Sequence, residues 1–154
     1  MPVGTVTKYN SLEKTITADA NRQWDDATAG NIMFILAGNT YTPAATHSTT
    51  ADLTDVITAG DGAPIAATGL AIDNTTTAGT TYFDSADANF GAAVTITAKY
   101  LIAIQPVTAN TYDPSTSKLL FYVDLDTTSS STEVSSIASD FVVYAPANGW
   151  FKTV

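Results

Sequence analysis

The fold of this chain is decided by one stretch, which reads Val94-Thr95-Ile96-Thr97-Ala98-Lys99-Tyr100-Leu101-Ile102-Ala103-Ile104. Its first half alternates apolar and polar residues with a period of two, which is typical of a strand with one buried face. Its second half is almost entirely apolar, which indicates a strand buried on both faces inside a sheet. Pro106 follows, and proline cannot donate to a β-ladder. We therefore predict one strand over 94–104 that ends before Pro106.

Two further stretches supply partners for this strand. Lys118 to Leu125 reads Lys-Leu-Leu-Phe-Tyr-Val-Asp-Leu and predicts a second strand. The polar segment Thr108 to Ser117 separates the two and contains Asp113-Pro114, a turn signal, so we expect a hairpin with a long loop. Asn31 to Ala37 is a short apolar run, and the glycines that flank it favour a strand over a short buried helix.

The remaining elements are shorter. We expect final strands over Asp140 to Tyr144 and Trp150 to Val154, and weaker strands over Val3 to Thr7, Thr15 to Ala18, Leu70 to Asp73 and Thr80 to Asp84. Leu53 to Thr58 and Ser85 to Phe90 each predict a turn or two of helix. Ala44 to Ala51 and the Ser/Thr-rich Thr127 to Ser136 are expected to be loops.

Short strands separated by turn residues along the whole chain predict an all-β fold, a sandwich or a barrel. No repeat, linker or change of composition divides the sequence, so we expect a single domain over residues 1–154. Pro2 and Gly4 disfavour regular structure at the start, which makes residues 1–12 a candidate extended N-terminal arm.

Composition favours a β-rich protein that does not bind nucleic acid. Charged residues make up only 14% of the 154, and Thr, which suits an exposed strand face, replaces much of the usual charge. The formal net charge is −9, so phosphate backbones and anionic membrane surfaces repel the chain. We expect no nucleic-acid or membrane partner.

Other features narrow the cellular context. The absence of cysteine excludes disulfides, thiolate metal sites and thiol catalysis. No run of about 18 apolar residues is present, and Met1 to Thr5 does not resemble the start of a signal peptide. We therefore expect synthesis in the cytoplasm.

Chemistry-bearing motifs are weak in this sequence. His47 is the only histidine and lies in a Thr-rich segment, with no cysteine in the chain and no serine in a nucleophile-elbow context near it, so we expect no catalytic role for it. Asp124 and Asp126 share one face of a predicted strand and are of the type that binds Ca²⁺, but no calcium-binding motif accompanies them. We predict no catalytic residue, no cofactor and no metal.

Three aromatic residues are candidates for a protein interface. Most aromatic residues fall inside apolar strands, where packing in the core is the ordinary role. Trp24 and Tyr41 lie beside polar segments, and Tyr9 lies near the start of the chain. We therefore predict Tyr9, Trp24 and Tyr41 as interface residues.

Several segments, taken in order, resemble the capsid decoration or cement proteins of tailed bacteriophages. They are Lys8 to Leu12, Tyr41-Thr42-Pro43 with His47, Phe83 to Phe90, Thr95 to Ile104, Leu119 to Leu125 and Gly149-Trp150-Phe151. Each is short, and the resemblance lies in their order and spacing over most of the chain. The sequence departs from the family at Phe90, where tryptophan is common, and in the Ala-rich segment 62–69, which is usually Gly-rich.

The resemblance implies a single antiparallel β-sandwich of jelly-roll-like form on the outer surface of a virion. It also implies the major capsid protein as partner and a symmetric homo-oligomer, with a trimer among the possible states. It carries over no catalytic residue, so we expect a structural protein and not an enzyme.

Two alternatives remain open at this stage. One is a tail- or fibre-associated module that binds a carbohydrate or receptor, which needs exposed aromatic side chains in a shallow groove. The other is a glycan hydrolase that uses two carboxylates for catalysis, and the sequence contains no motif that supports it.

Overall fold

A computed structural model describes residues 4–12, 31–73, 80–128 and 132–153. The described chain is all-β and antiparallel, and the predicted antiparallel β-sandwich is confirmed. Helical turns between strands include two short 3₁₀ turns, η1 (Thr50–Asp52) and η2 (Gly60–Gly62). In the described part of the chain, no helix has the length and apolar character needed to cross a bilayer.

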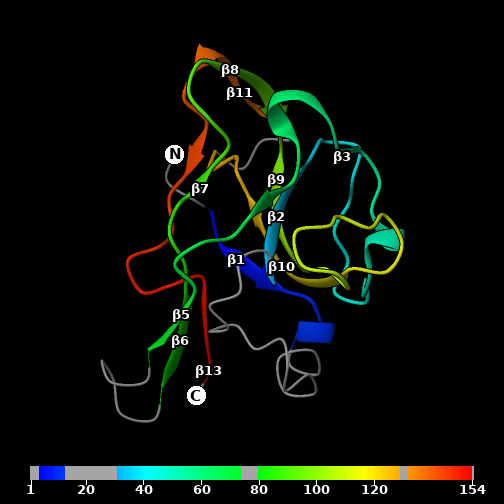
Figure 1. Cartoon of the computed structure of the whole chain (residues 1–154), viewed down its shortest axis with the longest axis vertical. Coiled ribbons are helices and arrows are strands. Elements are labelled where there is room, and N and C mark those ends of the chain that lie inside the picture. Colours follow the sequence, from blue (N-terminus) through cyan, green and yellow to red (C-terminus); the bar gives the residue numbers. More distant parts are fainter. Residues whose placement is uncertain (1–3, 13–30, 74–79, 129–131, 154) are drawn as a thin grey trace.

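A sheet with the strand order β1-β10-β9-β2-β3 forms the centre of the molecule (Figure 1), and β4 pairs with β2 beside β3. Its strands are β1 (Val6–Lys8), β2 (Met33–Ala37), β3 (Val56–Ile57), β4 (Ile65–Ala66), β9 (Tyr100–Gln105) and β10 (Lys118–Asp124). Every residue of β2 and β9 is buried, as expected of central strands with two covered faces. The predicted hairpin of β9 and β10 is confirmed by their antiparallel register.

The long strand predicted over 94–104 is in fact two strands in different sheets. β8 (Val94–Ala98) pairs with β11 (Val134–Ser139), whereas β9 belongs to the central sheet. Lys99 joins them: its N–H donates to Ala37 O at 2.8 Å, and its C=O accepts from Leu125 N at 2.8 Å. The burial pattern of each half agrees with its predicted periodicity. The two hydrogen bonds of Lys99 lie at the point where the chain passes from one sheet to the other.

Smaller sheets complete the fold above and below the central sheet in Figure 1. The β8–β11 ribbon lies at the top, and the three-stranded sheet β13-β6-β5 lies at the bottom. The latter contains β5 (Ala71–Asp73), β6 (Thr81–Asp84) and β13 (Phe151–Thr153). A further pair, β7 (Ala88–Asn89) with β12 (Val142–Val143), lies between them on the left.

Two hydrophobic clusters lie on opposite faces of the central sheet. Along β9, Leu101 and Ala103 enter one cluster while Tyr100, Ile102 and Ile104 enter the other, because successive side chains of a strand point to opposite faces. The first cluster joins the central sheet to the smaller sheets, and it includes Trp150, which is 2% exposed. The second contains most of the buried tyrosines. The two clusters together cover both faces of β2 and β9, whose side chains are apolar on each face.

Several local predictions need correction. Neither predicted helical turn is observed, because residues 56–57 pair with β2 and residues 88–89 pair with β12. Tertiary pairing thus outweighs the weak local preference for a helix. The predicted loop over 127–136 includes the start of β11 at Val134. The weak strand predicted over 15–18 lies outside the described residues.

Residues 4–12 lie against their own chain and do not form a free arm. β1 pairs with β10 in the register Val6 with Val123, and Gly4 N donates to Asp124 O at 3.2 Å. Leu12 is buried in the first cluster. The N-terminal segment is therefore an edge strand anchored by its side chains, which corrects the predicted arm over these residues.

Candidate functional site

A chain of hydrogen bonds joins Tyr9 and Tyr41, which belong to the second cluster, to His47. The Tyr9 and Tyr41 hydroxyls lie 2.8 Å apart, and the Tyr41 hydroxyl lies 3.0 Å from His47 Nδ1. Both tyrosines are 2% exposed, while His47 is half-buried. Of the three aromatic residues predicted at an interface, the structure thus places Tyr9 and Tyr41 in the interior, and Trp24 lies outside the described residues.

Further tyrosine rings pack around this chain. The Tyr9 ring lies 5.3 Å from that of Tyr122, and the Tyr41 ring meets that of Tyr100 edge-on at 5.8 Å. Burial raises the pKa of Tyr9, Tyr41 and Tyr100 because it disfavours the phenolate. These hydroxyls therefore stay protonated at neutral pH, and those of Tyr9 and Tyr41 act as hydrogen-bonding groups of the core. The burial of Tyr9 and Tyr41 is possible because their hydroxyls satisfy each other.

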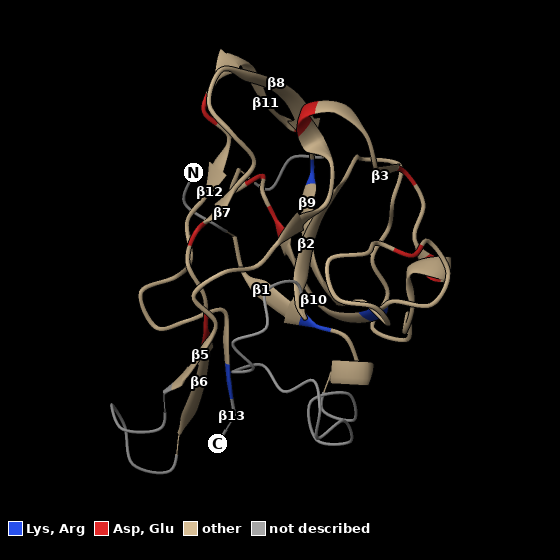
Figure 2. Ribbon diagram, viewed as in Figure 1, with Lys and Arg blue, Asp and Glu red and all other residues tan. Residues whose placement is uncertain are grey.

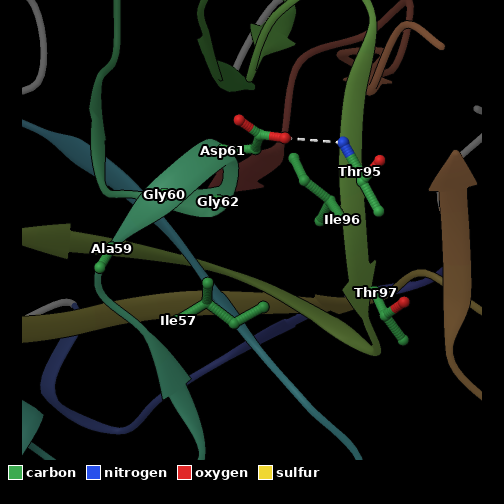
Figure 3. A pocket seen from close by; sticks show the side chains of 8 residues that line it. All are labelled: Ile57, Ala59, Gly60, Asp61, Gly62, Thr95, Ile96 and Thr97. Atoms are coloured by element: carbon green, nitrogen blue, oxygen red, sulfur yellow. Dashed lines mark hydrogen bonds between the residues drawn. The ribbon is translucent and has the colours of Figure 1, made fainter. Parts of the chain in front are cut away.

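A groove of about 440 Å³ lies between η2, β3 and the edge of β8 (Figure 3). Asp61 reaches across it, and its Oδ2 accepts a hydrogen bond from Thr95 N at 2.8 Å. A side chain thus takes the place that a neighbouring strand would occupy on this edge of β8. Asp61 is the only titratable residue among those that line the groove, so the lining does not hold a pair of acid and base groups.

A second groove, of about 640 Å³, lies over β1 and β10 and is lined in part by Thr5, Thr7, Tyr122, Asp124 and Asp126. The half-buried Tyr122 brings an aromatic ring to it, and the two threonines and two aspartates bring polar groups. An aromatic ring with polar groups around it is the type of surface that binds a sugar ring.

The two aspartates of this groove are not arranged as a metal site. Asp124 is the last residue of β10 and Asp126 follows the strand, and both line this groove, so the two carboxylates lie on the same side of the chain. Asp124 Oδ1 accepts from Asp126 N at 2.9 Å, and Asp124 Oδ2 lies 3.5 Å from Lys99 Nζ. Among the described residues, no group of three or more potential metal ligands comes together.

Carboxylates brace the loops throughout the described chain by accepting hydrogen bonds from backbone N–H groups. Asp52 accepts from Ser48 N at 2.7 Å, and Asp113 accepts from Ser115 N at 2.8 Å. Asp55, Asp61, Asp84, Asp87, Asp124, Asp126 and Glu133 act in the same way. These bonds favour the ionised form and hold the pKa of Asp52 and Asp113 below the ordinary 3.8. Carboxylates used in this way hold the loops in place.

Three large apolar side chains are exposed among the described residues: Ile137 at 79%, Tyr144 at 53% and Val107 at 51%. Sequence reasoning did not single out any of them. For Ile137 a signal was present, because it is the one large apolar residue in the run Ser135-Ser136-Ile137-Ala138-Ser139. Figure 2 shows acidic positions spread over the described chain, with basic positions just before β9, near β1 and β10, and on β13.

Comparison with known proteins adds no relative. No protein-family model matches the chain, and no curated protein or solved structure matches it either.

Proposed function

We propose that this chain is a structural protein of a tailed phage that binds the outside of the capsid and stabilises it. The observation that carries the proposal is the bracing of the surface loops by carboxylates. A surface that is already ordered before binding loses little conformational entropy when it docks on a large partner. Such a surface suits a protein that works by binding, and its acidity keeps it away from the packaged genome.

The proposed mechanism is stabilisation by linkage. A protein that binds the assembled shell but not its separated subunits shifts the equilibrium toward the shell. Many identical copies, each bound weakly, add up through multivalency if the protein is a homo-oligomer. The major capsid protein is the proposed partner, and the outer surface of the virion is the proposed location. No catalytic step is part of this role.

A second candidate is a carbohydrate-binding module of a phage tail or fibre. The specific observation in its favour is the groove over β1 and β10, where Tyr122 supplies an aromatic ring beside polar side chains. In this role, Tyr122 would stack on the sugar ring while Asp124 and the threonines bond its hydroxyls.

The first test is cosedimentation of the purified protein with expanded shells of the major capsid protein that lack it. We expect saturable binding and a higher temperature of shell disruption with the protein bound. The same preparation is then applied to a glycan array, with Tyr122→Ala as the matched variant. Absence of shell binding together with glycan binding that Tyr122→Ala abolishes would replace the capsid role by the carbohydrate role.

A further inference from the structure

The β8–β11 ribbon bends into the β7–β12 pair, and this bend carries a large apolar side chain that the fold itself does not use. We call residues 91–93 and 137–140 the ribbon end. Ser136 pairs with Ile96 and Ser139 with Val94, so two residues of β11 face one residue of β8 in a β-bulge. Ile137 lies in this bulge and has the most exposed of the large apolar side chains described, at 79%. The inward side chains of the ribbon, among them Val94 and Ile96, already pack in the first cluster, and Ile137 has no place in it.

Side-chain hydroxyls hold the bulge in one conformation. The buried Ser136 Oγ donates to Val94 O at 3.0 Å and accepts from Ile96 N at 3.2 Å, replacing ladder bonds that the bulge breaks. Ala138 N donates to Thr95 Oγ1 at 3.3 Å. The ribbon therefore presents Ile137 in a fixed position, which is how a docking residue avoids losing entropy on binding.

The backbone of the ribbon end is strained on both facing segments. Ala138 has a φ of +46° and Ala93 a φ of +56°, in the left-handed region that side chains other than glycine avoid. The two segments lie together, because Phe141 N donates to Gly91 O at 3.1 Å. Strain of this kind persists where the surrounding structure enforces it, and it gathers at functional sites.

Charge indicates what type of surface fits the ribbon end. Segments 86–98 and 132–145, which build it and its base, contain Asp87, Glu133 and Asp140 and no Lys or Arg. Lys99, which follows β8, is buried and paired with Asp124. A second copy of this acidic surface would be repelled, whereas a partner with Lys or Arg around an apolar recess would be attracted.

We propose that the ribbon end is the surface by which this chain docks on its partner, with Ile137 as the apolar anchor. The partner is a protein surface with an apolar recess and a basic rim, and we place it on the outer face of the capsid shell. This identification of the partner rests on the proposed function above. In this arrangement Ile137 fills the recess, while Asp140 meets the rim and makes the affinity sensitive to salt.

The test measures binding of the full chain to expanded shells of the major capsid protein by cosedimentation at several salt concentrations. Ile137→Ser removes the anchor while matching its serine neighbours, and Val107→Ser is the control, since Val107 is β-branched, exposed and distant in the sequence. We expect Ile137→Ser to weaken binding about tenfold or more, which is the usual effect of losing an anchor, and Val107→Ser to bind like the unaltered chain. Asp140→Asn is expected to reduce the salt dependence. Circular dichroism and thermal melting confirm that each variant is folded.

The outcomes separate this inference from the proposed function. If the unaltered chain binds and Ile137→Ser binds equally well, the ribbon end is not the docking surface, although the capsid role stands. If the unaltered chain does not bind shells at all, both the capsid role and this docking surface are overturned. Selective loss of binding in Ile137→Ser supports both.

Discussion

The substitutions Tyr41→Phe and Tyr9→Phe test whether these residues belong to the core. The Tyr41 hydroxyl bonds both Tyr9 and His47, while the Tyr9 hydroxyl has Tyr41 as its partner in the described structure. Removing the Tyr9 hydroxyl costs about 1 kcal/mol, the net value of one hydrogen bond, because Tyr41 keeps its bond to His47. Removing the Tyr41 hydroxyl costs about 2–4 kcal/mol, because it also leaves the buried Tyr9 hydroxyl without a partner.

The double substitution sharpens this prediction. In Tyr9→Phe/Tyr41→Phe neither hydroxyl is left unpaired, so we expect the double variant to be more stable than Tyr41→Phe alone by about 1 kcal/mol. The assay is urea unfolding at neutral pH, with the free energy of unfolding taken from the midpoint at unchanged slope. Equal costs for the two single variants, or costs that simply add in the double variant, would refute the hydrogen-bond argument. If none of the three variants changes the free energy of unfolding, Tyr9 and Tyr41 are not core residues, and the prediction of an interface role stands.

Two further predictions concern the fold. Gly149 has a φ of +73°, and a Cβ there would lie 2.6 Å from Phe83 O, so Gly149→Ala should destabilise by about 2–5 kcal/mol from strain plus overlap. Gly60 has a similar φ of +68° with open space around it, so Gly60→Ala should cost only about 1 kcal/mol; equal melting temperatures for the two variants would contradict this. The lowered pKa of Asp113 and Asp52 means that their stabilising contribution is complete above the unfolded value of 3.8 and is lost as pH falls through the folded value. Asp113→Asn should therefore lose less stability than the unaltered chain between about pH 5 and pH 2 in urea unfolding, and an identical loss in both would count against this role.

The candidate sites were less predictable than the strands, and the reason is physical. A strand with two buried faces needs an unbroken apolar run, so β9 and β2 can be read from the sequence alone. A surface site depends on which segments meet, and segments that are distant in the sequence meet only after folding. Asp61 and Thr95, which line opposite sides of the first groove, meet in this way. Neither residue shows a local signal for that contact.

The sequence by itself determined the class of the fold and its central strands. Alternation in Val94 to Ala98 and the apolar run from Tyr100 to Ile104 predicted the burial of each segment, because the period of a strand is a local property. The same holds for Lys118 to Asp124 and for the acidic, threonine-rich surface. These features follow from the side chains themselves and need no knowledge of the partners.

Only the tertiary structure decided which strands pair and which side chains remain outside. Lys99 divides one apparent strand between two sheets because its backbone bonds Ala37 and Leu125. Tyr41 is buried beside polar residues because its hydroxyl finds partners there. Ile137 stays in solvent because it follows Ser136, whose hydroxyl is held inside by bonds to Val94 and Ile96. In each case the outcome depends on the hydrogen bonds available across the chain, and hydropathy alone does not contain that information.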